Sequence, residues 1–444
     1  MNIKEKAKEF AILAHKGQVR KSDKEKPMII HPINVGLILE EYEFDDNVVA
    51  SGYLHDVIED TKYSEEDILK LFNEDITSLV VSASEMDKTL SWEERKQHTI
   101  DSIKNLDLRH KAIICADKIS NLEDLIILKE INGKLDFSNF NRNFDSQKWY
   151  YENIYKSLIN NVNETVPMYE RLKYLYEYLF YDKKDDEYLK NVIFKDNISE
   201  YDKLLKIKYK VKELVKLNSV MQNKKPFVIE FTGTPRTGKT TIINNLYDLF
   251  TKAGIKVSML EEFTTSKKYQ KEIKPNLKNQ YKKIVNFEIP RYVKEELECE
   301  IKKENDIILI DRSLFDRLIW VDRLHLKGEL KKEEYEEYKK EYVPMIKNKI
   351  DIIIGTYTDA TTAIKRDYKA YLSLEKRSFL NEENVNEYNT SLINIEKLSK
   401  KENINFYLFD TTNKSQRECT IDITNKILDC IKTKYIDELK KEYS

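Results

Sequence analysis

An eight-residue stretch from Gly233 to Thr240 constrains the fold of this chain more than any other. It reads GTPRTGKT, and it places two glycines five positions apart in a chain that has nine glycines among 444 residues. The apolar run FVIEFT precedes it, and the segment TTIINNL, which reads as a helix, overlaps its end. A short buried strand that turns directly into a helix is typical of a parallel sheet covered by helices. The sequence after Pro226 is therefore predicted to form an α/β domain.

Four further runs rich in β-forming residues, separated by long helical segments, support this sheet: KVSML, DIILID, DIIIGTY and INFYLF. Over residues 1–182, in contrast, apolar residues recur at helical spacing without an alternating strand pattern, which predicts an all-α domain. Residues 183–222 form a lysine-rich stretch with three-four spacing, typical of an amphipathic connecting helix. We expect a multidomain protein, with an all-α half over 1–182, a helical linker over 183–222 and an α/β P-loop half over 223–444.

The glycine-rich stretch has the form G-x-x-x-x-G-K-T, which predicts a phosphate-binding loop. In such a loop, backbone amides and a helix N-terminus cradle phosphates, a lysine reaches the β- and γ-phosphates, and a threonine hydroxyl holds Mg(II). Asp311 ends a later strand, where it would face that magnesium ion. We expect Mg(II)-ATP as the ligand, bound by Gly233, Arg236, Gly238, Lys239, Thr240 and Thr241.

A second constellation lies in YLHDVIEDTK, residues 53–62. Residues four apart share a helix face, so His55 would lie over Glu59, and Asp56 over Asp60. Crowded carboxylates repel one another unless a cation neutralises them, and the apolar flank VVASGYL argues against an open-water position. A His-Asp pair is more often structural when it occurs alone. Two more residues in apolar surroundings complete a mixed nitrogen and oxygen set that suits Mn(II), Fe(II) or Zn(II): His31 and Asp117.

Five motifs in order, AHKGQVRKS, IIHPINVG, GYLHDVIEDT, SWEERK and ADKISNL, resemble the HD-type hydrolase domain of RelA/SpoT proteins and of small alarmone hydrolases. The resemblance covers about residues 5–182. It implies an all-helical domain that holds one metal ion, usually manganese, and removes pyrophosphate from the 3′ position of (p)ppGpp. It also implies that Glu59 and Asp60 orient or deprotonate the attacking water. The metal ligands implied by motif position are His31, His55, Asp56 and Asp117.

Basic residues in and near these motifs are candidates for substrate binding, because a transferring phosphoryl group needs cations around it. Asn121 is expected to position the helix of the metal aspartate or to contact a nucleotide hydroxyl. The chain departs from the family at Ile114 and Cys115, where a lysine is typical, so NADPH or another nucleoside phosphate stays an alternative substrate. The candidate phosphate contacts are Arg20, Lys21, Lys88, Arg95 and Lys96.

The second half resembles the P-loop kinases that act on deoxynucleosides, thymidylate and nicotinamide riboside. The resemblance implies an ATP-dependent kinase of a nucleoside, nucleotide or related small molecule. By position, Glu262 is the candidate base, with Glu261 as the second choice, and Arg312 is a contact to the acceptor. Arg366 is the best candidate for a cation on a mobile lid, and Lys369, Lys376 and Arg377 are further candidates on the same segment. A rival interpretation is an ATP-binding switch that gates the hydrolase and transfers phosphate to nothing.

Composition limits the other functions that this chain can have. The formal net charge is −2 and 35% of the residues are charged, which describes a mixed surface and gives no basic stripe for nucleic acid. No apolar run approaches the roughly 20 residues of a membrane helix, and the first residues lack a signal-peptide core. The four cysteines show no metal-site spacing. We expect a cytoplasmic enzyme with small-molecule nucleotide partners, no membrane and no nucleic-acid partner, and an undetermined oligomeric state.

Overall fold

The computed structural model describes residues 2–85, 89–135, 142–183, 189–195, 197–222, 224–266, 269–273, 289–367 and 380–443. The chain forms two compact units. The first unit contains Met1–Met221 together with Lys432–Ser444, and the second contains Gln222–Ile431.

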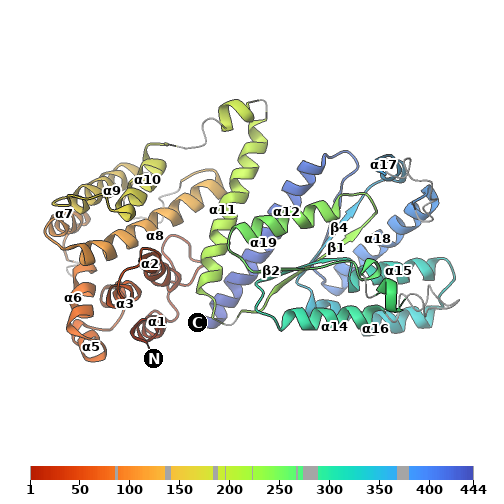
Figure 1. Cartoon of the computed structure of the whole chain (residues 1–444), viewed down its shortest axis with the longest axis horizontal. Helices are drawn as coiled ribbons and strands as arrows, with labels where there is room; N and C mark the ends of the chain where they lie inside the picture. Colours follow the sequence, from red (N-terminus) through yellow and green to blue (C-terminus); the bar gives the residue numbers. More distant parts are fainter. Residues whose placement is uncertain are drawn as a thin grey trace. The chain divides into compact units, whose positions relative to one another are not determined.

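The first unit is built from helices, as predicted for this half of the chain (Figure 1). Helix α8 is its longest element and packs against α2, α3, α10 and α11. The side chain of Asp107 accepts a hydrogen bond from the backbone N–H of His110 and so caps the start of α8. The helices are α1 (Ile3–Ala14), α2 (Ile30–Glu41), α3 (Asp46–Leu54), α4 (Val57–Asp60), α5 (Glu65–Leu71), α6 (Glu74–Ala83), α7 (Trp92–Ile103), α8 (Leu108–Asn132), α9 (Phe144–Leu158), α10 (Pro167–Phe180), η1 (Leu189–Ile193) and α11 (Ile198–Val220).

Helix α11 and the last residues of the chain are part of this first unit. The sequence-based division set residues 183–222 apart as a linker and assigned everything after 223 to the second domain. The compact units differ from it at both points. Helix α11 buries Leu214 and Leu217 and packs on α8 and α2. The hydroxyl of Tyr443 donates to the carbonyl of Val220 at 2.7 Å, which joins the C-terminal residues to the end of α11.

The second unit contains a five-stranded parallel sheet with strand order β2-β3-β1-β4-β5, which confirms the predicted α/β fold. Helix α12 covers one face of the sheet, and α14, α15 and α16 lie on the opposite face (Figure 1). The elements are β1 (Phe227–Gly233), α12 (Lys239–Lys252), β2 (Val257–Leu260), η2 (Phe263–Thr265), η3 (Tyr269–Ile273), α14 (Ile289–Ile301), β3 (Ile307–Asp311), α15 (Leu314–Leu326), α16 (Lys332–Lys349), β4 (Ile352–Tyr357), α17 (Ala360–Arg366), α18 (Glu382–Glu402), β5 (Phe406–Asp410) and α19 (Gln416–Tyr443). Helix α19 begins in this unit, and its residues from Lys432 on belong to the first unit.

The register of the sheet sets where the functional loops meet. Strands β1 and β3 are neighbours, and Phe231 pairs with Asp311. On the other side of β1, Gly233 pairs with Thr356 of β4. The carboxyl ends of adjacent parallel strands lie at one edge of a sheet, and ligands of open α/β sheets bind at that edge. The loop after β1 and the carboxylate at the end of β3 therefore meet there.

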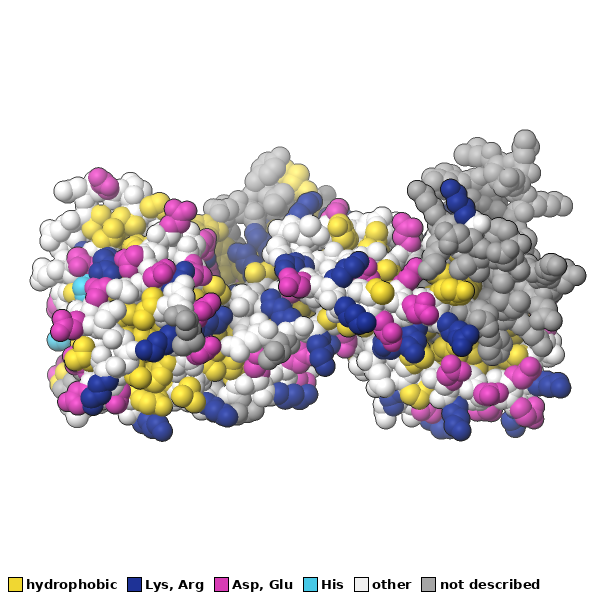
Figure 2. Space-filling view, turned by 60° about the horizontal axis from the view of Figure 1, so that its bottom comes forward, with side chains coloured by type: hydrophobic (Ala, Val, Ile, Leu, Met, Phe, Trp, Pro, Cys, Tyr) yellow, Lys and Arg dark blue, Asp and Glu magenta, His cyan; other side chains and the backbone are white. Residues whose placement is uncertain are grey.

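The face of the molecule drawn in Figure 2 carries interspersed charges of both signs. On the face drawn in Figure 2, Lys and Arg side chains alternate with Asp and Glu side chains, and hydrophobic side chains are scattered between them. None of the helices among the described residues is both long and apolar enough to span a bilayer.

Candidate active sites

Four side chains of the first unit converge on one point. His31 lies in the first turn of α2, His55 directly follows α3, Asp56 comes next, and Asp117 lies within α8. The Nε2 atom of His31 lies 3.1 Å from Oδ1 of Asp117 and 3.6 Å from Oδ2 of Asp56. The Nε2 atom of His55 lies 3.2 Å from Oδ1 of Asp56. One ligand atom each of His31, His55 and Asp117 lies within 4.8 Å of the others.

Hydrogen bonds on the far side of each imidazole orient the two histidines. Nδ1 of His55 lies 2.9 Å from the carbonyl oxygen of Gly52, and Nδ1 of His31 lies 3.1 Å from the hydroxyl of Ser120. A proton on Nδ1 leaves the Nε2 lone pair for a metal ion. Nε2 of His55 is buried, and among the residues that the structure describes it makes no well-directed hydrogen bond, although Oδ1 of Asp56 lies 3.2 Å away. Two imidazoles and two carboxylates therefore fit the divalent ion that the sequence predicted.

Burial and mutual attraction shape the charges of this cluster. Burial lowers the pKa of His31. Burial opposes charge on His55 as well, but the carboxylates of Asp56 and Asp117 and the carbonyl of Gly52 together outweigh it and raise the pKa of His55 to about 9. Burial also disfavours charge on Asp56, yet His55 holds its pKa below the ordinary value. Against the same burial, the ammonium of Lys118, 2.6 Å from Oδ2 of Asp117, keeps the pKa of that carboxyl well below its usual range. Both aspartates are therefore negatively charged near neutral pH.

A cavity of about 1090 Å³ adjoins this cluster, and His31, Asp56 and Asp117 form part of its wall. Glu59 and Asp60, from the short helix α4, also line it. Burial, followed by the charge of Asp56, raises the pKa of Glu59. A carboxylate with a raised pKa binds a proton more readily than an ordinary one. Glu59 is thus suited to take up a proton in the cavity.

The predicted substrate contacts meet in the same cavity. Asn121 donates from Nδ2 to Oδ1 of Asp117 at 2.6 Å and accepts a hydrogen bond from Nη2 of Arg20 at 2.9 Å. Lys88 lies outside the described residues. Contact of these side chains with a substrate stays a prediction. The predicted residues that line the cavity are Arg20, Lys21, Arg95, Lys96 and Asn121.

Sequence reasoning missed Glu85 and Tyr150, which also line this cavity. Oε2 of Glu85 accepts a hydrogen bond from Nη1 of Arg95 at 2.9 Å, and Oε1 accepts one from Lys96. The ammonium groups of Lys96 and Lys118 lie 4.8 Å and 5.4 Å from the centre of the Tyr150 ring. Glu85 follows the end of a helix without any motif, and Tyr150 is one of 28 tyrosines. Neither carried a signal that could have set it apart.

In the second unit, the glycine-rich stretch connects β1 to α12. Gly233 and Gly238 adopt φ values of 128° and 86°, which L side chains rarely reach. Lys239 begins α12, and its buried ammonium donates to the carbonyl oxygens of Gly233 at 3.1 Å and Thr234 at 2.8 Å. The side chain of Lys239 therefore contacts the same loop that is predicted to bind phosphate.

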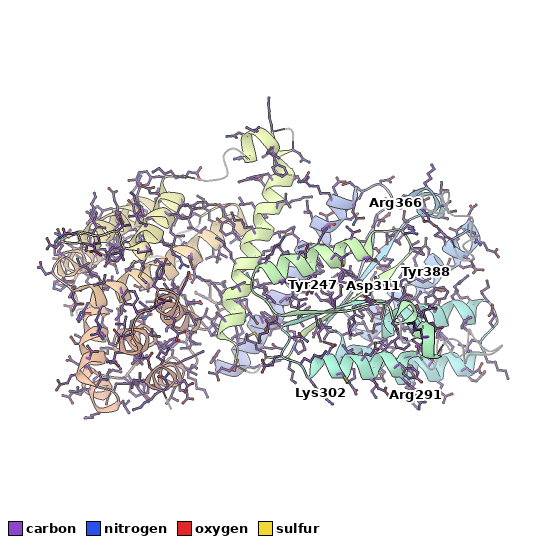
Figure 3. The ribbon with its side chains drawn as sticks, viewed as in Figure 1. Tyr247, Arg291, Lys302, Asp311, Arg366 and Tyr388 are labelled. Atoms are coloured by element: carbon purple, nitrogen blue, oxygen red, sulfur yellow. The ribbon has the colours of Figure 1, made fainter. Side chains whose placement is uncertain are left out.

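Thr240 and Asp311 are brought together, as a shared magnesium site requires. The hydroxyl of Thr240 donates to Oδ2 of Asp311 at 3.1 Å. Asp311, Tyr388 and Arg366 lie toward the end of the sheet where α12 begins (Figure 3). Arg236 points to another partner, Oδ1 of Asp367, at 2.7 Å, and Thr241 is exposed. Their part in nucleotide binding stays a prediction.

Glu262 and Arg312, which follow β2 and β3, also approach each other. Nε of Arg312 lies 3.6 Å from Oε2 of Glu262. The guanidinium donates at 2.8 Å to Oδ1 of Asp316 and at 2.8 Å to the carbonyl oxygen of Gly233. Glu261, the second choice for a base, is exposed. Glu262, the candidate base, therefore lies beside Arg312, a cation that is hydrogen-bonded to the phosphate-binding loop.

Burial dominates the charges of this second site. It lowers the pKa of Lys239 to about 7, and the nearby Arg312 adds to the effect. Burial raises the pKa of Asp311. It opposes charge on Arg312 too, but Asp316 and the other nearby acidic groups together outweigh it and raise the pKa of the guanidinium. An anionic ligand would favour the charged form of Lys239, and a divalent cation would favour the charged form of Asp311. Each would therefore oppose the effect of burial on the pKa of that residue.

Arg366 ends α17 and contacts the segment after β5. Its Nη2 donates to the carbonyl oxygen of Thr411 at 2.6 Å, and its Nη1 donates to the hydroxyl of the same residue at 3.1 Å. Thr411 follows the last strand in the sequence. The other predicted lid cations lie outside the described residues: Lys369, Lys376 and Arg377.

A buried polar network behind the loop was not predicted from the sequence. Glu230, inside β1, is fully buried and accepts backbone hydrogen bonds from Ser313, Phe315 and Asp316 at the start of α15. Asp316 is also fully buried and accepts hydrogen bonds from the hydroxyls of Thr232 and Tyr388. A single glutamate within an apolar strand is the one visible signal of this network.

Comparison with known proteins gives two family matches and several relatives. Residues 7–132 match the HD domain family, and residues 228–388 match an AAA domain family. The chain is similar to the guanosine-3′,5′-bis(diphosphate) 3′-pyrophosphohydrolase MESH1 of Drosophila melanogaster, with 41% identity over 119 residues that cover 26% of this chain and 66% of that protein. It is also similar to the guanosine-3′,5′-bis(diphosphate) 3′-pyrophosphohydrolase of Borreliella burgdorferi, with 34% identity over 197 residues that cover 39% of this chain and 29% of that protein.

Among solved structures, deoxyadenosine kinase from M. mycoides is 20% identical with a TM-score of 0.32, and the match covers 46% of this chain and 99% of that chain. The chain spans slightly under two thirds of the Drosophila relative and less than a third of the Borreliella relative. Its N-terminal part carries an HD domain with pyrophosphohydrolase homologues, and its C-terminal part carries an AAA domain with a P-loop. Both assignments agree with the motifs read from the sequence.

Proposed function

We propose that the first unit is a metal-dependent hydrolase that removes pyrophosphate from the 3′ position of a (p)ppGpp-type nucleotide. The observation that carries this proposal is the meeting of His31, His55, Asp56 and Asp117 beside a cavity with a basic wall. Those four residues would hold the ion, with manganese as the first choice. When bound, the ion would act as a Lewis acid and lower the pKa of a coordinated water.

The chain's own residues supply the remaining chemistry. Glu59, whose pKa is raised, takes the proton from the attacking water, and Asp60 helps to orient that water. The water oxygen bonds to the phosphorus next to the ribose, the bond from that phosphorus to the 3′ oxygen breaks, and the 3′ oxygen takes up a proton from the protonated Glu59 or from solvent to form the 3′ hydroxyl as pyrophosphate leaves. Arg20, Lys21 and the Arg95–Lys96 pair neutralise the diphosphate. NADPH or another nucleoside phosphate is the alternative substrate for this cavity.

For the second unit we propose a kinase that transfers the γ-phosphoryl group of Mg(II)-ATP to a nucleoside, nucleotide or related small molecule. Lys239 leaves its loop carbonyls for the phosphates, and Thr240 and Asp311 hold magnesium. Glu262 accepts the proton of the acceptor hydroxyl, and Arg312 binds the acceptor. Arg366 is the proposed lid cation, which would lie over the phosphates of ATP and help to exclude water.

One observation favours an ATP-binding switch as a second candidate for this unit. Arg312 lies 3.6 Å from Glu262 while it donates to Asp316 and to the loop carbonyl of Gly233. A carboxylate beside a fixed cation is a weaker base. Under this alternative, ATP binding controls hydrolysis and no phosphoryl group reaches an acceptor.

The test incubates the protein with manganese, magnesium, ATP and a panel of ppGpp, NADPH, nucleosides and nucleotides, and follows phosphate positions by mass spectrometry. We expect pyrophosphate from ppGpp and one phosphorylated acceptor. Asp56→Ala should abolish pyrophosphate release and leave ATP binding intact, and Lys239→Ala should do the reverse. Absence of pyrophosphate release from ppGpp by the wild type refutes the first proposal. A phosphorylated acceptor refutes the switch.

A further inference from the structure

Helix α11, outside the residues matched to the HD domain family, places a lysine beside the hydrolase site. The ammonium of Lys216 lies 2.9 Å from Oδ1 of Asp124 and 3.1 Å from Oε2 of Glu123, both on α8. Its side chain is 15% exposed and that of Asp124 is 18% exposed. The pair is therefore largely shielded from water. A charge interaction in such surroundings is stronger than on an open surface.

Asp124 connects this lysine to the predicted phosphate-binding residues. Its Oδ2 lies 3.2 Å from Nη2 of Arg20. The same Nη2 donates to Oδ1 of Asn121, whose Nδ2 donates to the metal-site residue Asp117. A continuous set of contacts thus runs from α11 through Asp124 and Arg20 to the metal site.

Arg20 contacts two spaces in the first unit. It lines the large cavity, and it also lines a small gap of about 10 Å³ together with Asp124 and Lys216. Burial opposes charge on Asp124, but Lys216 and then Arg20 keep its pKa below the ordinary value, so the carboxylate is ionised. An ionised and largely buried carboxylate must be paired with a cation. The cations in direct contact with Asp124 are the lysine of α11 and the arginine of the cavity wall, and the more distant Lys26, which is paired with Glu213, adds to their effect.

We propose that Lys216 is a positioning residue of the hydrolase site, which acts on an anionic substrate through Asp124 and Arg20. By neutralising Asp124, the lysine lets Arg20 keep its contact with Asn121 and present its other N–H groups to a diphosphate in the cavity. Without the lysine, Asp124 competes with the substrate for Arg20. This inference rests on the proposed role of Arg20 as a substrate contact, and it makes α11 a functional part of the hydrolase.

The experiment measures binding of inorganic pyrophosphate to metal-depleted full-length protein by calorimetry. It uses a Lys239→Ala background, because the phosphate-binding loop of the second unit would otherwise bind the same probe. We expect Lys216→Met to weaken pyrophosphate binding at least tenfold and Lys216→Arg to stay within twofold of the background. The matched control is Lys212→Met, one turn earlier on the same helix, where the lysine is exposed. It removes the same charge, and we expect less than a twofold change.

A double variant separates competition by Asp124 from a simple loss of positive charge. In Asp124→Asn/Lys216→Met the competing carboxylate is gone, so pyrophosphate affinity should recover to within about threefold of the background. The inference is wrong if Lys216→Met binds like the background, if Lys212→Met loses as much, or if the double variant stays as weak as Lys216→Met. If Lys216→Met fails to fold, Lys216→Gln replaces it, with the same criteria.

The outcome is independent of the nucleotide that the hydrolase cleaves. Loss of pyrophosphate affinity in Lys216→Met, together with no cleavage of ppGpp by the wild type, would support the positioning role and refute the proposed substrate. Cleavage of ppGpp by the wild type, together with unchanged pyrophosphate affinity in Lys216→Met, would do the opposite. The two failures are therefore distinguishable.

Discussion

Alanine at the two glycines of the phosphate-binding loop should have unequal effects on stability. A Cβ atom added at Gly233 would lie 1.9 Å from the backbone carbonyl oxygen of Thr356. At Gly238 the added atom would lie 1.8 Å from Oε1 of Gln416, the far end of a flexible side chain. Gly254 has a φ of 80° and nothing within 4 Å of an added Cβ. Gly254→Ala is therefore a control that measures the cost of left-handed backbone alone.

The expected losses in free energy of unfolding follow from these contacts. Gly254→Ala should cost about 1 kcal/mol, because a left-handed backbone costs an L residue roughly 1–2 kcal/mol. Gly238→Ala must also move Gln416, which brings the loss to about 2 kcal/mol. Gly233→Ala must displace a paired strand, since Gly233 and Thr356 are neighbours in the sheet. Roughly 1–3 kcal/mol for overpacking adds to a similar cost for the strained backbone, or about 4 kcal/mol in total.

Urea unfolding followed by the fluorescence of Trp320 would measure these losses. The chain has three tryptophans, and the other two, Trp92 and Trp149, lie in the first unit. A Trp92→Phe/Trp149→Phe background therefore reports on the second unit alone. If Gly233→Ala lost no more stability than Gly254→Ala, the close packing of the loop against β4 would be refuted.

Three further outcomes are expected. Folding raises the pKa of Glu230 from 4.5 to about 7, so the folded state holds this proton more tightly. One pKa unit corresponds to about 1.4 kcal/mol. The contribution of Glu230 to the free energy of unfolding therefore falls by about 3 kcal/mol as the pH rises from 4.5 to 7. The stability difference between wild type and Glu230→Gln, from urea titrations, should change by that amount. Asp316→Ala leaves the largely buried guanidinium of Arg312 without its closest carboxylate and should cost about 3 kcal/mol in the same assay. Chelation should stop pyrophosphate release and manganese should restore it, whereas ATP affinity, measured by calorimetry with magnesium added back to the chelated protein, should not change.

The fold class could be predicted because its signals are local. Each strand of the sheet is a short apolar run next to a turn or helix signal, and the buried strand β1 leads straight into the glycine loop. The helical half was visible from apolar spacing alone. Helix α11 was also recognised as an amphipathic helix. Its partner could not be recognised, because a hydrophobic stripe indicates that a helix packs and does not identify the surface that it packs against.

The residues of the candidate sites fall into two groups, those that a local sequence motif marks and those that it does not. His31, His55 and Asp117 occur in recognisable motifs, and the structure brings them together. Glu85 and Tyr150 reach the cavity through tertiary packing, and no motif marks them. Their side chains hold or cover basic residues that the sequence did indicate. A motif thus identifies groups whose chemistry is specific, while the residues that position those groups are chosen by shape and charge.

The C-terminal residues belong to the first unit, so residues that position a functional group can lie far apart in the sequence. Glu213 of α11 is buried between the ammonium of Lys26, at 2.7 Å, and that of Lys432, at 2.9 Å. The backbone N–H of Gly17 donates to the carbonyl oxygen of Tyr443 at 3.1 Å. These contacts hold both ends of the segment that contains Arg20. Because α11 and residues 432–444 lie on either side of the P-loop unit in the sequence, the support of this arginine depends on segments that a sequence division at 182 would have separated from it.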